Sequence, residues 1–310
     1  TSETQRANMS VHLPLKWTVA TVLGATLLAC GGEPTATDGH TGTADTLDTV
    51  TEQRTTGVMQ VGGKLFSIPS PVQTALLFRK LGVGYQKELP LPADQLDKLT
   101  SKAGRALAMG MYGADLAYVT IEKDGSRALT TLGLIEKLSG QLDLTNAFDK
   151  ALLERFKKNV ANEDSLLVLT GSAYRAADEY LKVNGRDDVS ALVLAGGWLE
   201  SLYLTVNAAS GKNDQALAQR IGEQKRTLDD LIALLQGADK ENLYSSLITE
   251  MKTLQTAFAG VSSTYTFEKP VTDAKTKTTH INSTSVITIS PAQIKAIAEQ
   301  VNKMRTQILA

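Results

Sequence analysis

The feature of this sequence that most limits its fold is a long stretch without proline. Residues 93–269 contain none, and leucine and alanine recur through them at the three- and four-residue spacing of amphipathic helices. A proline inside a helix removes one hydrogen bond and clashes with the preceding turn, so its absence allows helices throughout. The sequence therefore predicts an all-α fold, a multi-helix bundle of about eight to nine helices.

Capping residues and glycines set the expected helix ends. Pro71 begins a first helix that Gly82 ends, and Pro291 begins the last helix. The segment 187–209 is apolar almost all round, which predicts the buried centre of the bundle. The helices expected in between cover 93–122 with a break near Ser101, then 126–139, 145–160, 163–184, 187–209, 213–236 and 239–259.

Two short segments before the last helix show the alternation that is typical of strands. Residues 263–269 read STYTFEK and residues 283–290 read STSVITIS, with β-branched and polar residues alternating. A loop rich in lysine and threonine, which holds His280, joins them. We expect a small β-hairpin there, within a single helical domain that covers 67–310.

The amino-terminal region has the pattern of a secretory signal. Residues 17–28 are mostly apolar and follow Lys16. As a helix they would be about 18 Å long, which is shorter than the ~30 Å hydrocarbon layer of a membrane. We therefore interpret residues 1–29 as a signal peptide with a short extension upstream of Met9, not as a membrane-spanning segment.

The only cysteine of the chain, Cys30, ends this apolar run. The sequence LLAC at 27–30 resembles the lipobox of bacterial lipoproteins. The resemblance implies cleavage before Cys30 and attachment of a lipid to its sulfur. The alternative is an ordinary signal peptide whose cleavage site contains a cysteine. Gly31 is not the aspartate that retains enterobacterial lipoproteins at the inner membrane, so the outer membrane of the cell envelope is favoured.

Residues 30–66 have the composition of a flexible tether. They are rich in threonine and glycine and offer few apolar residues for a core, so we expect the lipidated cysteine to be followed by a disordered spacer. Thr46 and Thr49 lie in DTL and DTV, which resemble the short O-glycosylation motif of Bacteroidota. The alternative is a plain solvated spacer.

Several chemistries have no residues to carry them. The three histidines, His12, His40 and His280, lie outside the predicted helical stretch, and lipidation would remove the only thiol. We therefore expect no histidine-assisted triad, no metal centre and no cofactor. The net charge of −1 gives no argument for nucleic acid as a partner.

Two acidic residues, Asp115 and Glu200, stand among apolar residues on helices that should be interior. A buried carboxylate needs a partner or a raised pKa, and raised pKa values gather at functional sites. One interpretation is a structural cluster with an arginine such as Arg127 or Arg175; the others are a ligand pocket and a catalytic acid pair. The candidate buried polar or ligand site consists of Tyr112, Asp115, Tyr118, Trp198, Glu200 and Tyr203.

Four segments carry a resemblance to a known group of proteins. They read MYGADLAYV, TNAFDKAL, EDSLLVL and DEYLKVNGRDDVSALVLAGGWLESLY. Together, over residues 69–207, the chain resembles a group of helical lipoproteins from Bacteroidota. The resemblance implies an envelope location and brings no catalytic residue with it.

The anchor, the spacer and the missing catalytic side chains predict a membrane-anchored lipoprotein of the cell envelope. We expect a non-enzymatic binding or accessory module that meets the membrane through its lipid and takes an envelope protein as partner. The alternatives are an envelope enzyme that uses Asp115 and Glu200, and a protein that binds a small ligand between its helices.

Overall fold

The computed structural model describes residues 57–61, 64–68, 71–144, 150–159, 162–210, 214–273, 275, 278–280 and 282–310. Cys30, Thr46 and Thr49 lie outside this part of the chain, so their predicted modifications stay predictions. The described residues form nine α-helices and one 3₁₀ helix, with a few short strands. The predicted all-α fold is confirmed.

The α-helices are α2 (Pro71–Leu81), α3 (Lys102–Ile121), α4 (Gly125–Gln141), α5 (Lys150–Lys158), α6 (Glu163–Val183), α7 (Asp187–Ala209), α8 (Gln215–Ala238), α9 (Ser245–Ala257) and α10 (Pro291–Leu309). The 3₁₀ helix is η1 (Ala93–Lys98). The strands are β1 (Gly57–Val61), β2 (Lys64–Ile68), β3 (Ser262–Thr266), β4 (Val271–Asp273), β5 (Thr278–His280) and β6 (Thr284–Thr288).

The capping residues act as the sequence indicates. Gly82 follows α2 with a φ of 62°, a backbone conformation that glycine adopts at low cost. Ser101 separates η1 from α3, because its side chain accepts a hydrogen bond of 2.9 Å from the backbone of Gly104. At α10, Ser290 and Gln293 form a reciprocal capping box ahead of Pro291.

Helix α9 begins at Ser245, later than the expected residue 239. The Asp239 carboxylate accepts hydrogen bonds from the backbone N–H groups of Leu243 and Tyr244, at 2.7 and 2.9 Å. Asn242 adopts a φ of 57°. These contacts form a turn in place of the helical ladder, so the predicted helix over 239–244 is wrong.

Helices α3 and α7 touch through their backbones. A Cβ atom added to Gly110 would collide with the carbonyl oxygen of Val193, and one added to Gly196 would collide with that of Leu107. Both obstacles are backbone atoms, which cannot turn aside as a side chain does. Glycine at both positions is therefore a packing requirement.

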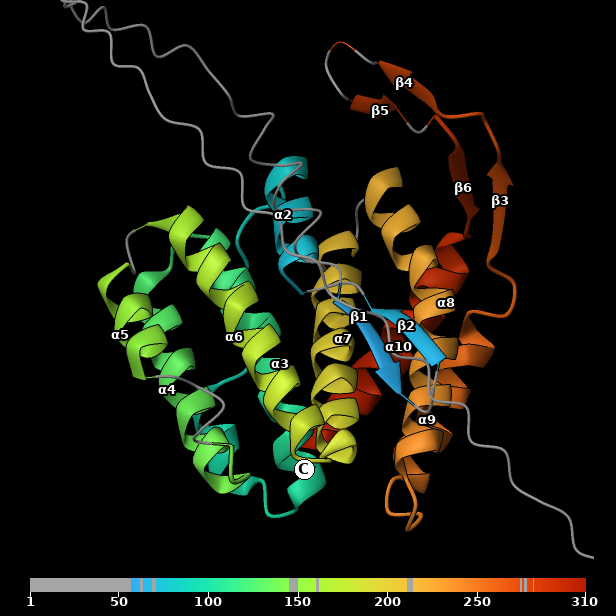
Figure 1. Ribbon diagram of the computed structural model, residues 1–310. Helices are drawn as coiled ribbons and strands as arrows, with labels where there is room; N and C mark the ends of the chain where they lie inside the picture. The colour runs from blue at the N-terminus through green and yellow to red at the C-terminus, as the bar shows by residue number, and fades with distance from the viewer. Residues whose placement is uncertain are drawn as a thin grey trace, which may run out of the picture. The chain divides into compact units, whose positions relative to one another are not determined.

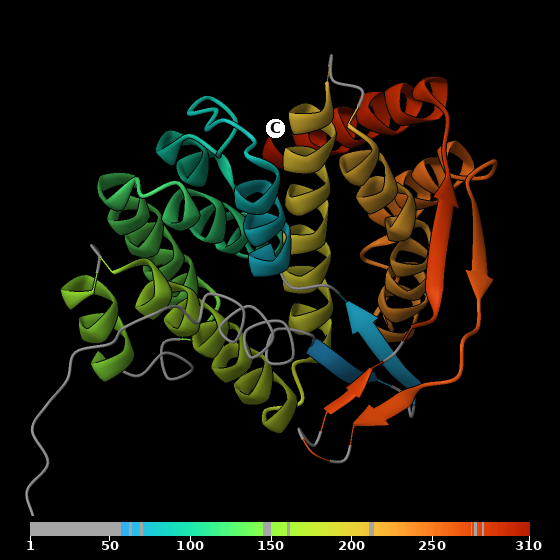
Figure 2. The same ribbon diagram turned by 90° about the horizontal axis from the view of Figure 1, so that it is seen from above.

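Five of the other helices pack directly against this pair. Helices α2, α4 and α6 contact α3, whereas α8 and α10 contact α7. Figures 1 and 2 both show α7 between the α3–α6 group and the helices α8 and α9. The predicted position of residues 187–209 at the centre is confirmed by near-complete burial of α7.

Helix α7 is also long and apolar enough to cross a membrane when judged by length and composition. Its mean hydropathy over the best window is 1.5, but 89% of that window is buried inside the protein. Burial of this extent is typical of the core helix of a bundle. Among the described residues, no other helix meets the same criterion.

The predicted hairpin is present and consists of two ladders. Strand β3 pairs with β6 in antiparallel register, and β4 pairs with β5 further along the same arm. His280 lies in β5 and pairs with Val271, so its expected position in the loop is wrong. Tyr265 and Phe267 on this arm are exposed.

A pair of strands that the sequence analysis does not predict lies at the end of the segment assigned to the tether. Residues 57–61 and 64–68 pair antiparallel as β1 and β2, with Met59 opposite Phe66. Most of this pair therefore lies within residues 30–66, which the sequence assigns to the spacer. These strands contact α8.

Substitution of Gly196 by alanine tests the helix contact. We expect Gly196→Ala to lower the free energy of unfolding by about 2–4 kcal/mol, because the new methyl group meets a backbone carbonyl. Gly133→Ala is the matched control: its Cβ meets nothing within 4 Å, so we expect a gain of up to about 1 kcal/mol. Urea denaturation followed by circular dichroism measures both, and equal effects would contradict the close contact.

Candidate functional site

Glu200 of α7 forms a buried ion pair with Arg305 of α10. Its side chain is completely inaccessible to solvent, and that of Arg305 is 13% exposed. The guanidinium donates from Nε to Oε2 and from Nη2 to Oε1, each at 2.8 Å. This bidentate geometry is the strongest form of arginine–carboxylate pairing. It neutralises a charge that would otherwise be very costly inside the core.

Asp115 of α3 lies beside this pair and is 1% exposed. Its Oδ2 accepts a hydrogen bond of 2.8 Å from the backbone N–H of Leu91. Its Oδ1 is buried and has no donor among the described residues while both carboxyl groups are ionised. The carboxyl groups of Asp115 and Glu200 are close enough to share a hydrogen bond once one of them holds a proton.

These surroundings favour the protonated form of Asp115. Burial raises the pKa of Asp115 well above its ordinary value, and the negative charge of Glu200 raises it further; the Leu91 N–H and Arg305 oppose both effects. Burial also raises the pKa of Glu200, although Arg305 opposes the rise. We assign one proton to the two acids and place it on Asp115, where it supplies the missing donor toward Glu200.

Two tyrosines complete what we call the buried polar cluster, defined as Tyr112, Asp115, Glu200, Tyr203 and Arg305. The Tyr112 hydroxyl donates to the carbonyl of Pro92 at 3.0 Å. The ring of Tyr203 lies 3.8 Å from the guanidinium carbon of Arg305, a cation–π contact. Burial raises the pKa of both phenols, so they stay neutral.

The buried polar cluster holds the segment 85–92, which we call the clasped loop. Arg305 donates to the carbonyl of Leu89 at 2.9 Å. Asp115 accepts from the N–H of Leu91, and Tyr112 donates to the carbonyl of Pro92. Arg127 of α4 donates to the carbonyls of Lys87 and Pro90. Side chains thus satisfy backbone groups that have no helix or sheet partner.

The structure brings four of the six predicted residues together: Tyr112, Asp115, Glu200 and Tyr203. The expected partner Arg127 holds the clasped loop without contacting either acid, and the side chain of Arg175 lies outside the described part. The arginine at the acids is Arg305.

Tyr118 and Trp198 lie elsewhere. The Tyr118 hydroxyl accepts the backbone N–H of Gln86 at 3.0 Å, and its ring packs edge-on against Phe78 and Tyr85. Trp198 donates to Gln224 at 2.9 Å and lines a cavity of about 10 Å³, room for about one water molecule. Neither residue belongs to the predicted common site.

Burial limits what the two acids can do chemically. A catalytic carboxylate pair needs a cleft in which a substrate and water reach both groups. Here Glu200 is locked by Arg305 and Asp115 faces the clasped loop. The geometry therefore favours the structural interpretation of Asp115 and Glu200.

Arg305 escaped the sequence analysis because it follows Glu200 by 105 residues. Its position does carry a signal. On α10, Val301 and Met304 are buried, and residue 305 lies one turn after Val301, at the edge of the apolar face. An arginine at such an edge is placed to reach an acid inside the core.

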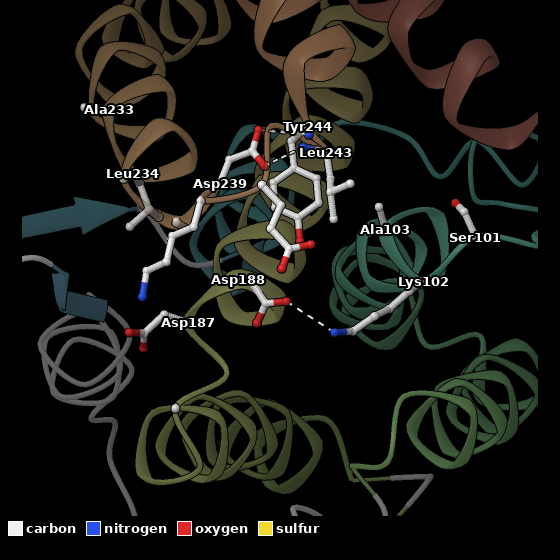
Figure 3. A pocket seen from close by; sticks show the side chains of 15 residues that line it. Ser101, Lys102, Ala103, Asp187, Asp188, Ala233, Leu234, Asp239, Leu243 and Tyr244 are labelled. Atoms are coloured by element: carbon white, nitrogen blue, oxygen red, sulfur yellow. Dashed lines mark hydrogen bonds and ion pairs between the residues drawn. The ribbon is translucent and has the colours of Figure 1, made fainter.

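A second candidate site lies where several helix ends meet. A cavity of about 860 Å³, which we call the helix-end cavity, opens between the starts of α3 and α7, the end of α8 and the turn before α9. Figure 3 shows Lys102 and Asp188 joined by their ion pair, with Tyr244 beside Asp188. No local pattern in the sequence indicates this cavity, because its walls come from three separate segments of the chain, 101–103, 185–188 and 233–244, which contain ordinary helix ends.

Acidic groups dominate the helix-end cavity. Asp188 pairs with Lys102 at 3.3 Å, and Asp239 is occupied by backbone N–H groups. Asp187 and Glu241 complete the acidic lining. Burial and the nearby charges of Asp188, Asp239 and Glu241 raise the pKa of Tyr244 to about 12. The phenol is therefore a neutral hydroxyl at physiological pH.

Removal of Arg305 tests the role of the buried polar cluster. We expect Arg305→Leu to lower the free energy of unfolding by about 3–5 kcal/mol, because Glu200 then keeps an unpaired buried charge. Glu200→Leu added to the same chain should restore part of the loss. The control is Lys303→Leu, which breaks an exposed pair with Glu250 and should cost less than about 1 kcal/mol. Similar losses for both single variants in urea denaturation would contradict this role.

The proton on Asp115 predicts a pH dependence. Because the folded-state pKa of Asp115 is raised, its contribution to stability is complete below the unfolded pKa of about 3.9 and is lost as pH rises through the folded pKa. Asp115→Asn mimics the protonated acid and removes this titration. We therefore expect the urea midpoint of the variant to rise relative to that of the wild type as pH increases above about 4. Parallel pH profiles would refute the protonated state.

Comparisons with known proteins add no assignment to either site. No protein-family model matches the chain, and neither a curated protein nor a solved structure matches it. The roles described above rest on contacts within this chain. The resemblance to lipoproteins of Bacteroidota stays a prediction.

Proposed function

We propose that the chain is a lipid-anchored, non-enzymatic binding module of the bacterial cell envelope. Cys30, the only cysteine, ends an apolar run in a lipobox-like sequence, which supports attachment to a membrane without a spanning helix. The outer membrane is the proposed destination, and an envelope protein is a proposed partner. The spacer after Cys30 would hold the helical body away from the lipid.

The observation that carries the binding part of this proposal is the helix-end cavity. Ligand sites in proteins commonly measure about 300–1,000 Å³ and combine apolar walls with a few polar groups. The cavity of about 860 Å³ falls in this range, and its lining includes Leu234 and Tyr244 together with several charged groups. The buried acids Asp115 and Glu200, by contrast, are engaged in holding the clasped loop and α10.

Three full-length proteins test the proposal: the wild type, Cys30→Ala and Gly237→Phe. Gly237 lines the cavity, and a Cβ there meets nothing within 4 Å, so a phenylalanine can fill the space without a backbone clash. We expect the wild type to enter the detergent phase in a partition experiment and to carry a small-molecule adduct in native mass spectrometry. Cys30→Ala should move to the aqueous phase, because it lacks the lipid.

Gly237→Phe tests binding in the cavity and serves as the control for the anchor. It should remain in the detergent phase, since its anchor is intact, and it should lose the adduct. A Cys30→Ala protein that stays in the detergent phase would contradict the anchor. An adduct that survives Gly237→Phe, or a wild type without one, would contradict ligand binding in the cavity.

A further inference from the structure

We infer that the helix-end cavity binds a small organic cation, a primary alkylammonium group on an apolar body. This inference rests on the proposed binding function and names the class of ligand. It follows from three properties of the lining: the excess of carboxylates, the apolar wall beside them, and the absence of a convergent metal-binding group among the described residues.

The charge of the lining selects for a cation. Four carboxylates, those of Asp187, Asp188, Asp239 and Glu241, face two ammonium groups, which leaves a net charge of −2. Lys102 neutralises Asp188. Asp187, at the start of α7, and Glu241, in the turn before α9, form no ion pair with any described residue. An ammonium group in the cavity would be attracted by both carboxylates, whereas an anion would be repelled.

The apolar part of the wall selects for a ligand with a carbon body. Leu234 and Tyr244 are buried beneath the cavity, whereas Leu243 at its edge is 69% exposed. A large leucine side chain so exposed beside a cavity offers contact area to an occupant. The neutral hydroxyl of Tyr244 lies near the acids and can accept a hydrogen bond from an ammonium group.

A metal ion is a poorer fit than an organic cation. Among the described residues, no three acidic, histidine or cysteine side chains converge as a metal site requires. The Asp239 carboxylate is also held in place, since each of its oxygens accepts a backbone hydrogen bond, so it is not free to turn toward a metal ion. The carboxylates of the lining are separate from one another and lie beside apolar residues. This arrangement suits an elongated organic cation better than a single metal ion.

Isothermal titration of the full-length protein with cadaverine, a five-carbon diamine, tests this inference. The pentanediol of the same length is the neutral control. We expect saturable binding of cadaverine, weakened by added sodium chloride because the exposed carboxylates are screened, and no binding of the diol. Equal binding of both compounds, or no binding of cadaverine, would overturn the cationic ligand.

Paired variants locate the binding. Asp187→Asn combined with Glu241→Gln should weaken cadaverine binding about ten-fold, since two exposed charge interactions are lost. Glu299→Gln on α10 makes the same kind of charge change away from the cavity and should leave affinity unchanged. Thermal melting by circular dichroism verifies that each variant is folded. Unchanged affinity in the double variant would overturn the assignment of Asp187 and Glu241.

Two further results separate this inference from the function on which it rests. If the native adduct disappears in Gly237→Phe but cadaverine does not bind, the cavity is a ligand site and the cationic class is wrong. If the adduct is insensitive to Gly237→Phe, the proposed function itself fails. Titration with a glycine-flanked lysine tripeptide distinguishes the source of the ammonium group: tighter binding than cadaverine would indicate a lysine side chain of a partner protein.

Discussion

The backbone contact between α3 and α7 is the constraint on which the rest of the described structure depends. Gly110 and Gly196 let the two helices touch. Glu200 follows Gly196 by about one helical turn, and Asp115 follows Gly110 by slightly more. Both acids are buried in the same region, and with the shared proton on Asp115 the charge that needs compensation is that of Glu200. Arg305 supplies this compensation, and in doing so it fixes α10 against α7.

The same contacts extend from the centre to the surface. Arg305 donates to Leu89 as well as to Glu200, and Asp115 accepts from Leu91. One buried group of side chains thus organises a helix contact, the docking of α10 and a loop without regular structure. Polar groups in a core can confer this kind of specificity, because only one arrangement satisfies all of them.

Much of the fold follows from local signals in the sequence. Helix caps and prolines act on the few residues around them. The absence of proline from residues 93–269, the cap at Ser101 and the proline at residue 291 therefore allowed the helices to be predicted. The turn after Asp239 could not, because its side chain competes with the helix for two backbone groups. The strands at 57–68 were hidden by the composition of the spacer before them, although GVMQV and KLFSI are separated by two glycines, a recognised hairpin pattern.

The sites were less predictable, since they depend on which helices meet. Asp115 and Glu200 stood out because a charge in an apolar segment needs an explanation. Trp198 is close to Glu200 in the sequence, which suggests a common site. Residues two positions apart on a helix differ by about 200° around its axis, however, so Trp198 and Glu200 face different neighbours. The helix-end cavity has no local signal at all, because its walls come together only when α3, α7 and α8 are packed.

The distance along the chain between Glu200 and Arg305 has a consequence for biosynthesis. A chain that emerges amino terminus first exposes α7 well before α10 is complete. Until Arg305 arrives, burying Glu200 would leave a charge without a counterion, which disfavours the final dry interface between α3 and α7. Close packing around Glu200 is therefore thermodynamically coupled to the presence of the last helix.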